Sequence, residues 1–138
     1  MEEKLFRDSA VKAARTSGFK FPRALRIKKR FEFKRLSASG TRLKGSHIFI
    51  EYRKGKFPHP RLGLTVTKKF GKAHDRFRFK RQVREAFRHL APFIGEPVEI
   101  NVRPKIEAAT ATSQEIFDDL YRLLAETQSR TEKGSHNN

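Results

Sequence analysis

A run of thirteen residues, RFRFKRQVREAFR at positions 76–88, constrains the fold more than any other part of the sequence. On a helical wheel its apolar residues gather in one arc, and its cations fill the remaining side. Over a helix predicted for 74–90, the apolar arc comprises Phe79, Val83, Ala86, Phe87 and Leu90. The chain therefore has to place one helix between a hydrophobic core and a densely positive surface.

The cationic side of this predicted helix carries six Arg or Lys residues within 76–88 and a single acid, Glu85. Lys80, Arg84 and Arg88 follow one another at i,i+4 spacing, where like charges repel by a few tenths of a kcal/mol each. A polyanionic partner would remove that repulsion, and Glu85 is expected to be an ion-pair partner that orients the arginines. Phe77 projects into the same side. Either the helix begins after Phe77, which then plugs its start, or Phe77 is exposed and stacks against a partner.

The charge balance favours nucleic acid as the partner, because the 138-residue chain has a net charge of +17. Residues 19–56 carry 13 basic and 2 acidic side chains, whereas residues 89–138 carry 5 and 8, so the partner should meet the first two-thirds of the chain. No apolar run is long enough to span a membrane, and the N-terminus lacks the apolar core of a signal peptide. Cysteine is absent, and a cytoplasmic location is expected.

Hydrophobic periodicity predicts six elements between residues 22 and 126. They are a helix from Pro22 through Leu36, strands at 47–52 and 62–67, the helix at 74–90, a strand at 98–103, and a helix capped by Ser113. This order predicts an α+β fold, an α/β sandwich in which helices pack against one small mixed sheet. Residues 1–21 are expected to form a flexible extension, 22–126 one RNA-binding domain, and 127–138 a polar tail.

Residue types offer no active site within the protein itself. The five histidines have no metal-ligand spacing, cysteine is absent, and no glycine-rich phosphate loop occurs, so no metal site or catalytic residue is predicted.

Phe31 and Phe33 point in different directions on a helix, and Phe49 lies on the minor face of its strand. Aromatic rings beside Lys and Arg are typical of platforms for single-stranded RNA, although a helical Phe33 could equally belong to the core.

The block RLGLTVTKKFGKAHDRFRFKRQVREAFR at 61–88 resembles the signature of the bacterial ribonuclease P protein component. That signature is a strand R-[ILV]-G-L-x-V-x-K-K followed by A-x-x-R-N-R-x-K-R-x-x-R-E-x-F-R. Upstream, RIKKRFEFKRL resembles the first helix of the family, and downstream VEINVRPK resembles its last strand. Two positions differ: Phe77 replaces the asparagine of R-N-R, and Ser37 replaces the second aromatic residue of the first helix.

The resemblance implies a left-handed βαβ crossover, against the common right-handed rule. It also implies a protein subunit that helps a catalytic RNA remove the 5′ leader of precursor tRNA, with Mg²⁺ held mainly by the RNA. The protein would be monomeric when free and bind ribonuclease P RNA one to one. The implied contacts to the RNA subunit are Arg76, Arg78, Lys80, Arg81, Arg84 and Arg88. The implied contacts to the leader are Phe33, Phe49, Lys68 and Lys69.

Two other classes of protein compete with this interpretation. A small basic ribosomal protein would explain the charge, but not the specific block at 61–88. A stand-alone nuclease would need an acid–base or metal-binding set of residues, which the sequence does not offer.

Overall fold

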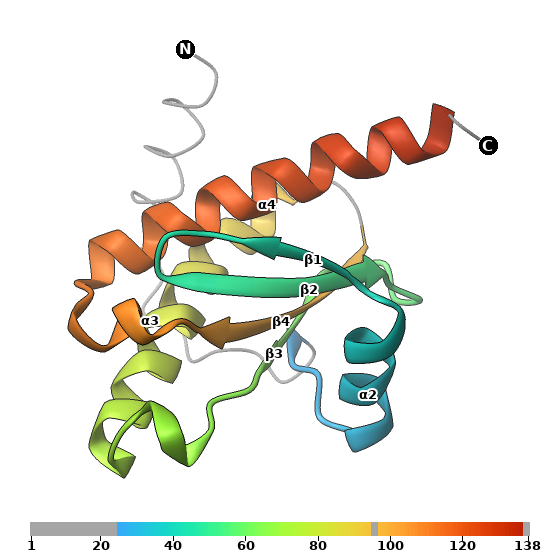
Figure 1. The fold of residues 1–138 in the computed structure, drawn as a ribbon. Helices are drawn as coiled ribbons and strands as arrows, with labels where there is room; N and C mark the ends of the chain where they lie inside the picture. The colour runs from blue at the N-terminus through green and yellow to red at the C-terminus, as the bar shows by residue number, and fades with distance from the viewer. Residues whose placement is uncertain (1–24, 95–96, 137–138) are drawn as a thin grey trace.

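The computed structural model describes residues 25–94 and 97–136 (Figure 1). Its helices are α2 (Arg30–Ser39), α3 (Ala73–Leu90) and α4 (Ser113–His136), and its strands are β1 (Thr41–Lys44), β2 (Ile48–Lys54), β3 (Arg61–Leu64) and β4 (Val98–Pro104). Short 3-10 helices follow β3, α3 and β4 along the chain: η2 (Lys68–Phe70), η3 (Ala91–Phe93) and η4 (Ile106–Thr110). The predicted α+β class is confirmed. The extension expected at 1–21, and the helix start expected at Pro22, lie outside the described residues.

The four strands form one mixed sheet in the order β1-β2-β4-β3. Strand β2 pairs antiparallel with β1 and β4, whereas β3 pairs parallel with β4. The sequence does not predict β1, because Leu43 is the only buried residue among its four and no alternation results. The strands predicted at 47–52 and 62–67 are not neighbours, since β4 lies between them, and the second of them ends at Leu64.

Helix α3 connects the two parallel strands β3 and β4. In Figure 1 both strands run from right to left, β4 lies above β3, and α3 lies behind the sheet. A chain that leaves β3, passes behind the sheet and returns one strand higher turns in the left-handed sense. The crossover therefore has the hand that the resemblance implies, against the common right-handed rule.

The core lies between the sheet and the two helices α3 and α4. Ile50, Ile100 and Val102 project from the central strands into it and are fully buried. The arc predicted on α3, from Phe79 to Leu90, is buried in full, as are Ile116, Phe117, Leu120, Leu123 and Leu124 of α4. Each large apolar side chain buried in this way stabilises the fold by about 1.5–3 kcal/mol. Burial of the apolar arc leaves the cationic arc of α3 on the outside.

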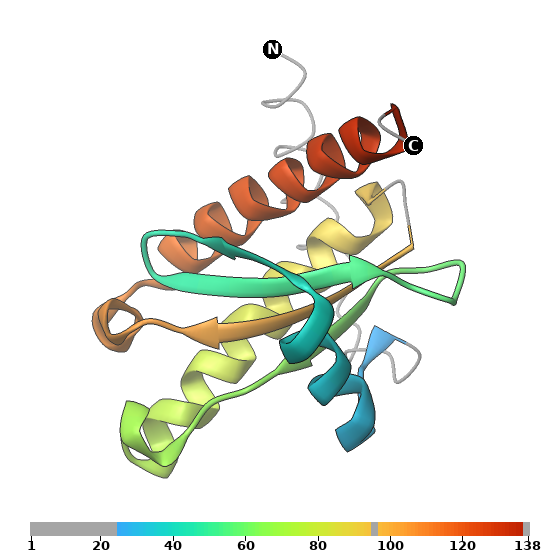
Figure 2. The same ribbon diagram turned by 45° about the vertical axis from the view of Figure 1, so that its right-hand side comes forward.

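Helix α2 lies on the other side of the sheet, away from α3 and α4 in both views (Figures 1 and 2). It begins at Arg30 and not at Pro22 as predicted. The segment just before it runs along the free edge of β3: Arg26 forms a parallel bridge with Leu62, and the Ile27 N–H donates to the Leu62 carbonyl at 2.8 Å. These backbone bonds hold the segment extended, so the helix starts only after it.

Helix α4 continues to His136, so residues 127–136, which were predicted as a polar tail, are helical. Its cap is Thr112 and not Ser113. The Thr112 hydroxyl accepts the Glu115 N–H at 3.1 Å, and the Glu115 carboxylate accepts the Thr112 N–H at 2.9 Å. This reciprocal pair is a capping box, which satisfies two N–H groups at the helix start.

Candidate functional site

The cationic side of α3 is the first candidate surface. Arg76, Lys80, Arg81 and Arg84 form no side-chain hydrogen bond or ion pair with any other residue that the structure describes. Arg81 is exposed, and the other three are half-buried. Arginine and lysine side chains that lack an internal partner are available to phosphates. Contact of these four residues with RNA stays a prediction.

The other two predicted RNA contacts on α3 are engaged within the protein. Arg78 donates to the carbonyl of Ala111 at 3.1 Å, which ties α3 to the end of η4. Arg88 donates to Glu85 at 2.8 Å, and its side chain is only 12% exposed. The predicted role of Glu85 as an ion-pair partner is confirmed, whereas contact of Arg78 and Arg88 with RNA stays a prediction.

Arg84 illustrates the electrostatic strain on this surface. Partial burial lowers the pKa of the Arg84 guanidinium, and the neighbouring positive charge of Arg26 lowers it further. Both effects disfavour a charge that the residue nevertheless carries, because arginine stays protonated in proteins. An anion bound at this position would relieve both effects, which suits a phosphate group.

Phe77 lies fully within this cationic surface. Helix α3 begins at Ala73, four residues before Phe77, and 70% of the Phe77 residue is exposed. The alternative in which Phe77 plugs the helix start is therefore wrong. Its ring faces solvent among arginines.

Replacement of Phe77 by asparagine is expected to leave the melting temperature nearly unchanged, because little apolar surface is buried there. The change in the free energy of unfolding should stay within about 0.5 kcal/mol. Phe79→Ala is the matched control two residues away: Phe79 is 1% exposed, and its loss should cost about 3–5 kcal/mol. Thermal melts of both variants decide the point, and a drop for Phe77→Asn comparable to that of the control would contradict the exposed placement.

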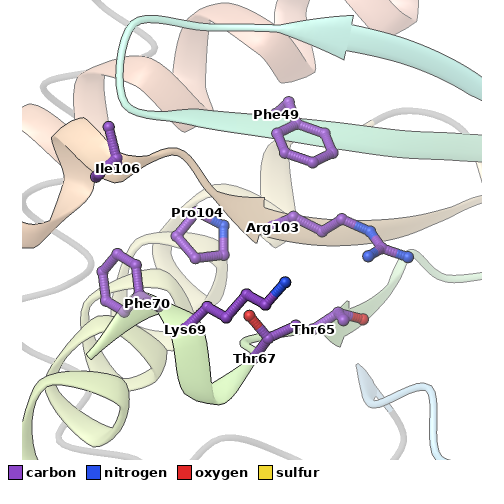
Figure 3. Close-up of a pocket in the computed structure, with 8 residues that line it drawn as sticks. All are labelled: Phe49, Thr65, Thr67, Lys69, Phe70, Arg103, Pro104 and Ile106. Atoms are coloured by element: carbon purple, nitrogen blue, oxygen red, sulfur yellow. The ribbon is translucent and has the colours of Figure 1, made fainter. Parts of the chain in front are cut away.

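The second candidate surface is a pocket of about 280 Å³ on the α2 side of the sheet (Figure 3). Its lining residues are Phe49, Thr65, Thr67, Lys69, Phe70, Arg103, Pro104 and Ile106. The lining combines aromatic rings, hydroxyl groups and two cations. In such a combination the rings can stack on a base, the hydroxyl groups can donate hydrogen bonds to a sugar or accept them from it, and the cations can pair with a phosphate.

A buried carboxylate organises the cations beside this pocket. Glu51 is 2% exposed and accepts hydrogen bonds from Arg42 at 3.1 Å, Arg103 at 3.0 Å and Asn101 at 3.2 Å. Burial alone would raise the pKa of Glu51, but these hydrogen bonds outweigh it and hold the pKa below its usual value. The carboxylate therefore stays charged and fixes Arg103 at the pocket wall. The Arg42 guanidinium also lies 5.1 Å from the centre of the Phe49 ring, which it helps to orient.

The four predicted leader contacts are not all brought together. Phe49 and Lys69 both line the pocket, whereas Lys68 is exposed outside its lining. Phe33 is half-buried on the same side of the sheet, against Gly63: a Cβ atom at Gly63 would lie 2.5 Å from the Phe33 ring. Glycine is thus required at position 63 by the ring. Phe33 therefore packs on the sheet and stays half-buried, and its contact with the leader stays a prediction.

The sequence did not single out six of the pocket residues: Thr65, Thr67, Phe70, Arg103, Pro104 and Ile106. Arg103 and Pro104 do stand in the stretch VEINVRPK, which resembles the last strand of the family, and that was a usable signal. Thr65 and Thr67 alternate with apolar residues along the strand predicted at 62–67, so their side chains were expected on the polar face without a defined role.

The sequence of this chain matches a known protein family. The sequence profile of the family described as Ribonuclease P matches residues 21–128, which is most of the chain. The chain belongs to the ribonuclease P protein family. This family match covers both surfaces described above, the cationic side of α3 and the pocket.

Curated relatives in the family carry the description ribonuclease P protein component. The protein of Desulfosudis oleivorans is 38% identical over 108 residues, covering 78% of this chain and 89% of the relative. That of Chlamydia felis is 47% identical over 68 residues, covering 49% of each. The match therefore spans about half the length of the Chlamydia relative.

Solved structures of ribonuclease P proteins have the same fold. The Staphylococcus aureus protein aligns with a TM-score of 0.70 at 30% identity, covering 76% of this chain and 96% of that one. The Thermotoga maritima protein aligns with a TM-score of 0.67 at 30% identity, covering 72% and 94%. The arrangement of helices and sheet described here is thus that of the family.

Two other kinds of site are absent from the described part of the chain. Within 25–94 and 97–136, no three His, Cys, Asp or Glu side chains gather closely enough to hold a metal ion. In the same part of the chain, no helix is long and apolar enough to cross a membrane.

Proposed function

We propose that this chain is the protein subunit of ribonuclease P and acts in the endonucleolytic removal of the 5′ leader from precursor tRNA. One observation carries the proposal: two surfaces suited to RNA lie on opposite sides of one sheet. One is the cationic side of α3, and the other is the pocket beside α2. A protein with two such surfaces can hold a large RNA with one and a short single strand with the other. Family membership supports the same assignment.

The cationic side of α3 would bind the RNA subunit, with one protein for each RNA. Arg76, Lys80, Arg81 and Arg84 would pair with phosphates, releasing bound counterions. The pocket would hold the single-stranded leader: Phe49 supplies a ring for stacking, and Lys69 and Arg103 supply charge. Together, the two contacts would fix the leader relative to the RNA subunit, which positions the cleavage site.

Mg²⁺ would be held by the RNA partner and not by this chain. The ion prefers an octahedral shell of oxygen ligands, commonly from carboxylates and phosphates. The described residues hold no group of three His, Cys, Asp or Glu side chains that could bind a metal ion, and the buried or half-buried acids Glu51, Glu32 and Glu99 are each paired with arginine. Bound to RNA, Mg²⁺ would supply the activated water and stabilise developing charge. The protein would contribute position and positive charge.

Reconstitution tests the proposal. RNA-free protein should leave precursor tRNA intact, and the same protein added to the cognate RNA subunit should raise the rate of leader removal at low Mg²⁺. Sequencing RNA that co-purifies with the protein provides a second measurement, in which one abundant structured RNA of the ribonuclease P type is expected. Leader release by the protein alone, or enrichment of ribosomal RNA, would contradict the proposal.

Arg84→Ala is expected to weaken binding to the RNA subunit. In a plot of log K against log salt concentration, the slope should fall by roughly one, because one phosphate contact is lost. Stability should not fall, since Arg84 carries a charge that burial and Arg26 both disfavour. Arg84→Lys is the matched control, because it keeps the charge and should keep the slope. A variant with normal melting and an unchanged slope would show that this residue does not face RNA.

A further inference from the structure

Helix α2 has an outward face that neither the pocket nor the core uses. Phe33 and Leu36 point toward the sheet, whereas Phe31, two residues before Phe33, lies about 200° around the helix from it. Phe31 is accordingly 54% exposed, and Arg30 and Lys34 beside it are exposed as well. We call Arg30, Phe31, Lys34 and Arg35 the outer face of α2.

Two cations lie against the exposed ring of Phe31. The Arg35 guanidinium carbon is 5.4 Å from the ring centre, and the Lys29 ammonium nitrogen is 5.8 Å from it. Both distances are within the range of a cation–π contact. The ring is therefore held at a defined position on the surface, with positive charge at its border.

The cations of the outer face itself are not balanced by an acid among the described residues. Among the residues that the structure describes, Arg30, Lys34 and Arg35 form no ion pair with a carboxylate. The single acid of the helix, Glu32, points to the opposite side, where it accepts a hydrogen bond from Arg61 at 2.6 Å and is only 12% exposed. Because Glu32 forms its salt bridge on the sheet side, its negative charge does not offset the cations of the outer face.

One exposed phenylalanine is ordinary on a protein surface. An exposed ring bordered by uncompensated cations, on a helix where like charges repel, is a more specific arrangement. Single-stranded RNA relieves both features at once, because a base covers the ring and phosphates neutralise the cations. A membrane surface fits less well, since it requires several large apolar residues on one face, and the outer face has one.

We propose that the outer face of α2 binds the part of the precursor tRNA leader that extends beyond the pocket, with a base stacked on Phe31. This extends the proposed function, on which it rests. The leader is the RNA in reach, because α2 lies on the pocket side of the sheet and α3 lies on the other (Figure 2). A strand leaving the Phe33 side reaches Phe31 by passing around one helix, about 10 Å across.

A series of precursors with leaders lengthened one nucleotide at a time tests this extended site. Binding is measured with the assembled holoenzyme under conditions that prevent cleavage. For the unmodified protein, affinity should rise in two steps, the first when the pocket fills and the second when the leader reaches Phe31. The second step should be about 5- to 150-fold, the range for one stacked base.

Three variants separate the possible causes of the second step. Phe31→Leu keeps an apolar side chain without an aromatic ring and should lose the second step while keeping the first. Lys34→Ala combined with Arg35→Ala should lower the salt slope for long leaders only, by roughly 0.7 for each lost phosphate contact with single-stranded RNA. Arg81→Ala removes a charge from the opposite side of the sheet, so it should weaken RNA-subunit binding and leave the dependence on leader length unchanged.

Several results would overturn the extended site. Affinity of the unmodified holoenzyme could reach its plateau after the first step, or Phe31→Leu could weaken short and long leaders equally. A large drop in the melting temperature of Phe31→Leu would mean that another part of this chain covers the ring. A holoenzyme that binds leader-bearing precursor no better than mature tRNA would contradict the leader pocket itself, which separates failure of the proposed function from failure of this inference.

Discussion

Replacing Asp119 with alanine is expected to lower the free energy of unfolding by about 3–5 kcal/mol. The Asp119 carboxylate is 3% exposed and accepts the backbone N–H groups of Ser46, His47 and Ile48 at 2.9–3.0 Å. It also accepts a hydrogen bond from Arg122 at 2.6 Å. Loss of the carboxylate leaves the turn between β1 and β2 without its anchor on α4, and it leaves three N–H groups, among them the buried one of Ile48, without their acceptor.

The effect of this substitution should depend on pH. Burial would raise the pKa of Asp119, but the hydrogen bonds from the three N–H groups and Arg122 outweigh it, so the pKa lies below its usual value. A lowered carboxylate pKa contributes stability that is present above the unfolded pKa of about 3.9 and is lost as pH falls through the folded pKa. The difference between the two proteins should therefore be full at neutral pH and shrink in acid.

Thermal and denaturant unfolding at several pH values measure both effects. Asp118→Ala is the matched control, since it removes the same charge from the neighbouring, half-buried position of α4 and should cost much less. An Asp119→Ala variant that melts like this control, or a difference that grows toward acid pH, would contradict the anchoring role.

The cationic helix and the core could be predicted from the sequence because their signals are local. The apolar arc of α3 repeats at helical spacing over five residues, and each of them is buried. Alternation in β4 likewise identified Ile100 and Val102 as core residues. The spacing of apolar residues is a property of the local sequence, so it indicates the buried face without knowledge of the elements that pack against it.

Elements whose form depends on a distant partner were not predicted. Strand β1 contains one buried residue and exists because β2 supplies its hydrogen bonds. Arg26 and Ile27 are extended because β3 offers a free edge, although Leu25, Lys29 and Phe33 suggested helical spacing. In both cases hydrogen bonds to a strand elsewhere in the fold determine the backbone conformation, and the local sequence pattern does not indicate them.

The burial of the polar face of the sheet could not be predicted from the sequence. Glu51, Glu99 and Asn101 alternate with apolar residues, which predicts exposed positions, yet all three are buried. Helix α2 covers this face, and arginines from other elements satisfy the acids. The pocket depends on this arrangement. The residue pattern indicated Phe49 and the family resemblance added Lys69, but neither predicted the charges that hold the site.

Arg61→Met is expected to lower the free energy of unfolding by about 3–5 kcal/mol, because it leaves the buried Glu99 and the half-buried Glu32 without their shared cation. Arg61 donates to Glu32 of α2 at 2.6 Å and to Glu99 of β4 at 3.1 Å. It also donates to the Arg26 carbonyl at 3.2 Å, while the Phe57 ring lies 4.7 Å from its guanidinium carbon. One side chain thus joins α2, two strands and the edge segment.

The pH dependence of Arg61→Met should distinguish lost charge pairing from lost packing. In the unmodified protein the hydrogen bond from Arg61 outweighs burial and lowers the pKa of Glu32. Without Arg61, burial and repulsion by the neighbouring Glu99 carboxylate should raise the pKa of Glu32 above its usual value. A carboxylate with a raised pKa destabilises the fold when it is ionised, so the deficit should shrink as pH falls through that pKa.

A triple variant completes the test of this junction. Adding Glu32→Gln and Glu99→Gln to Arg61→Met removes the unpaired charges and should recover much of the lost stability at neutral pH, as measured by denaturant unfolding. Recovery of stability need not restore the position of α2, because glutamines cannot replace the ion pairs that fix it against β3. The holoenzyme containing the triple variant should therefore remain less selective for leader-bearing precursor over mature tRNA. A stable triple variant with full selectivity would show that Phe33 and the pocket are positioned without Arg61.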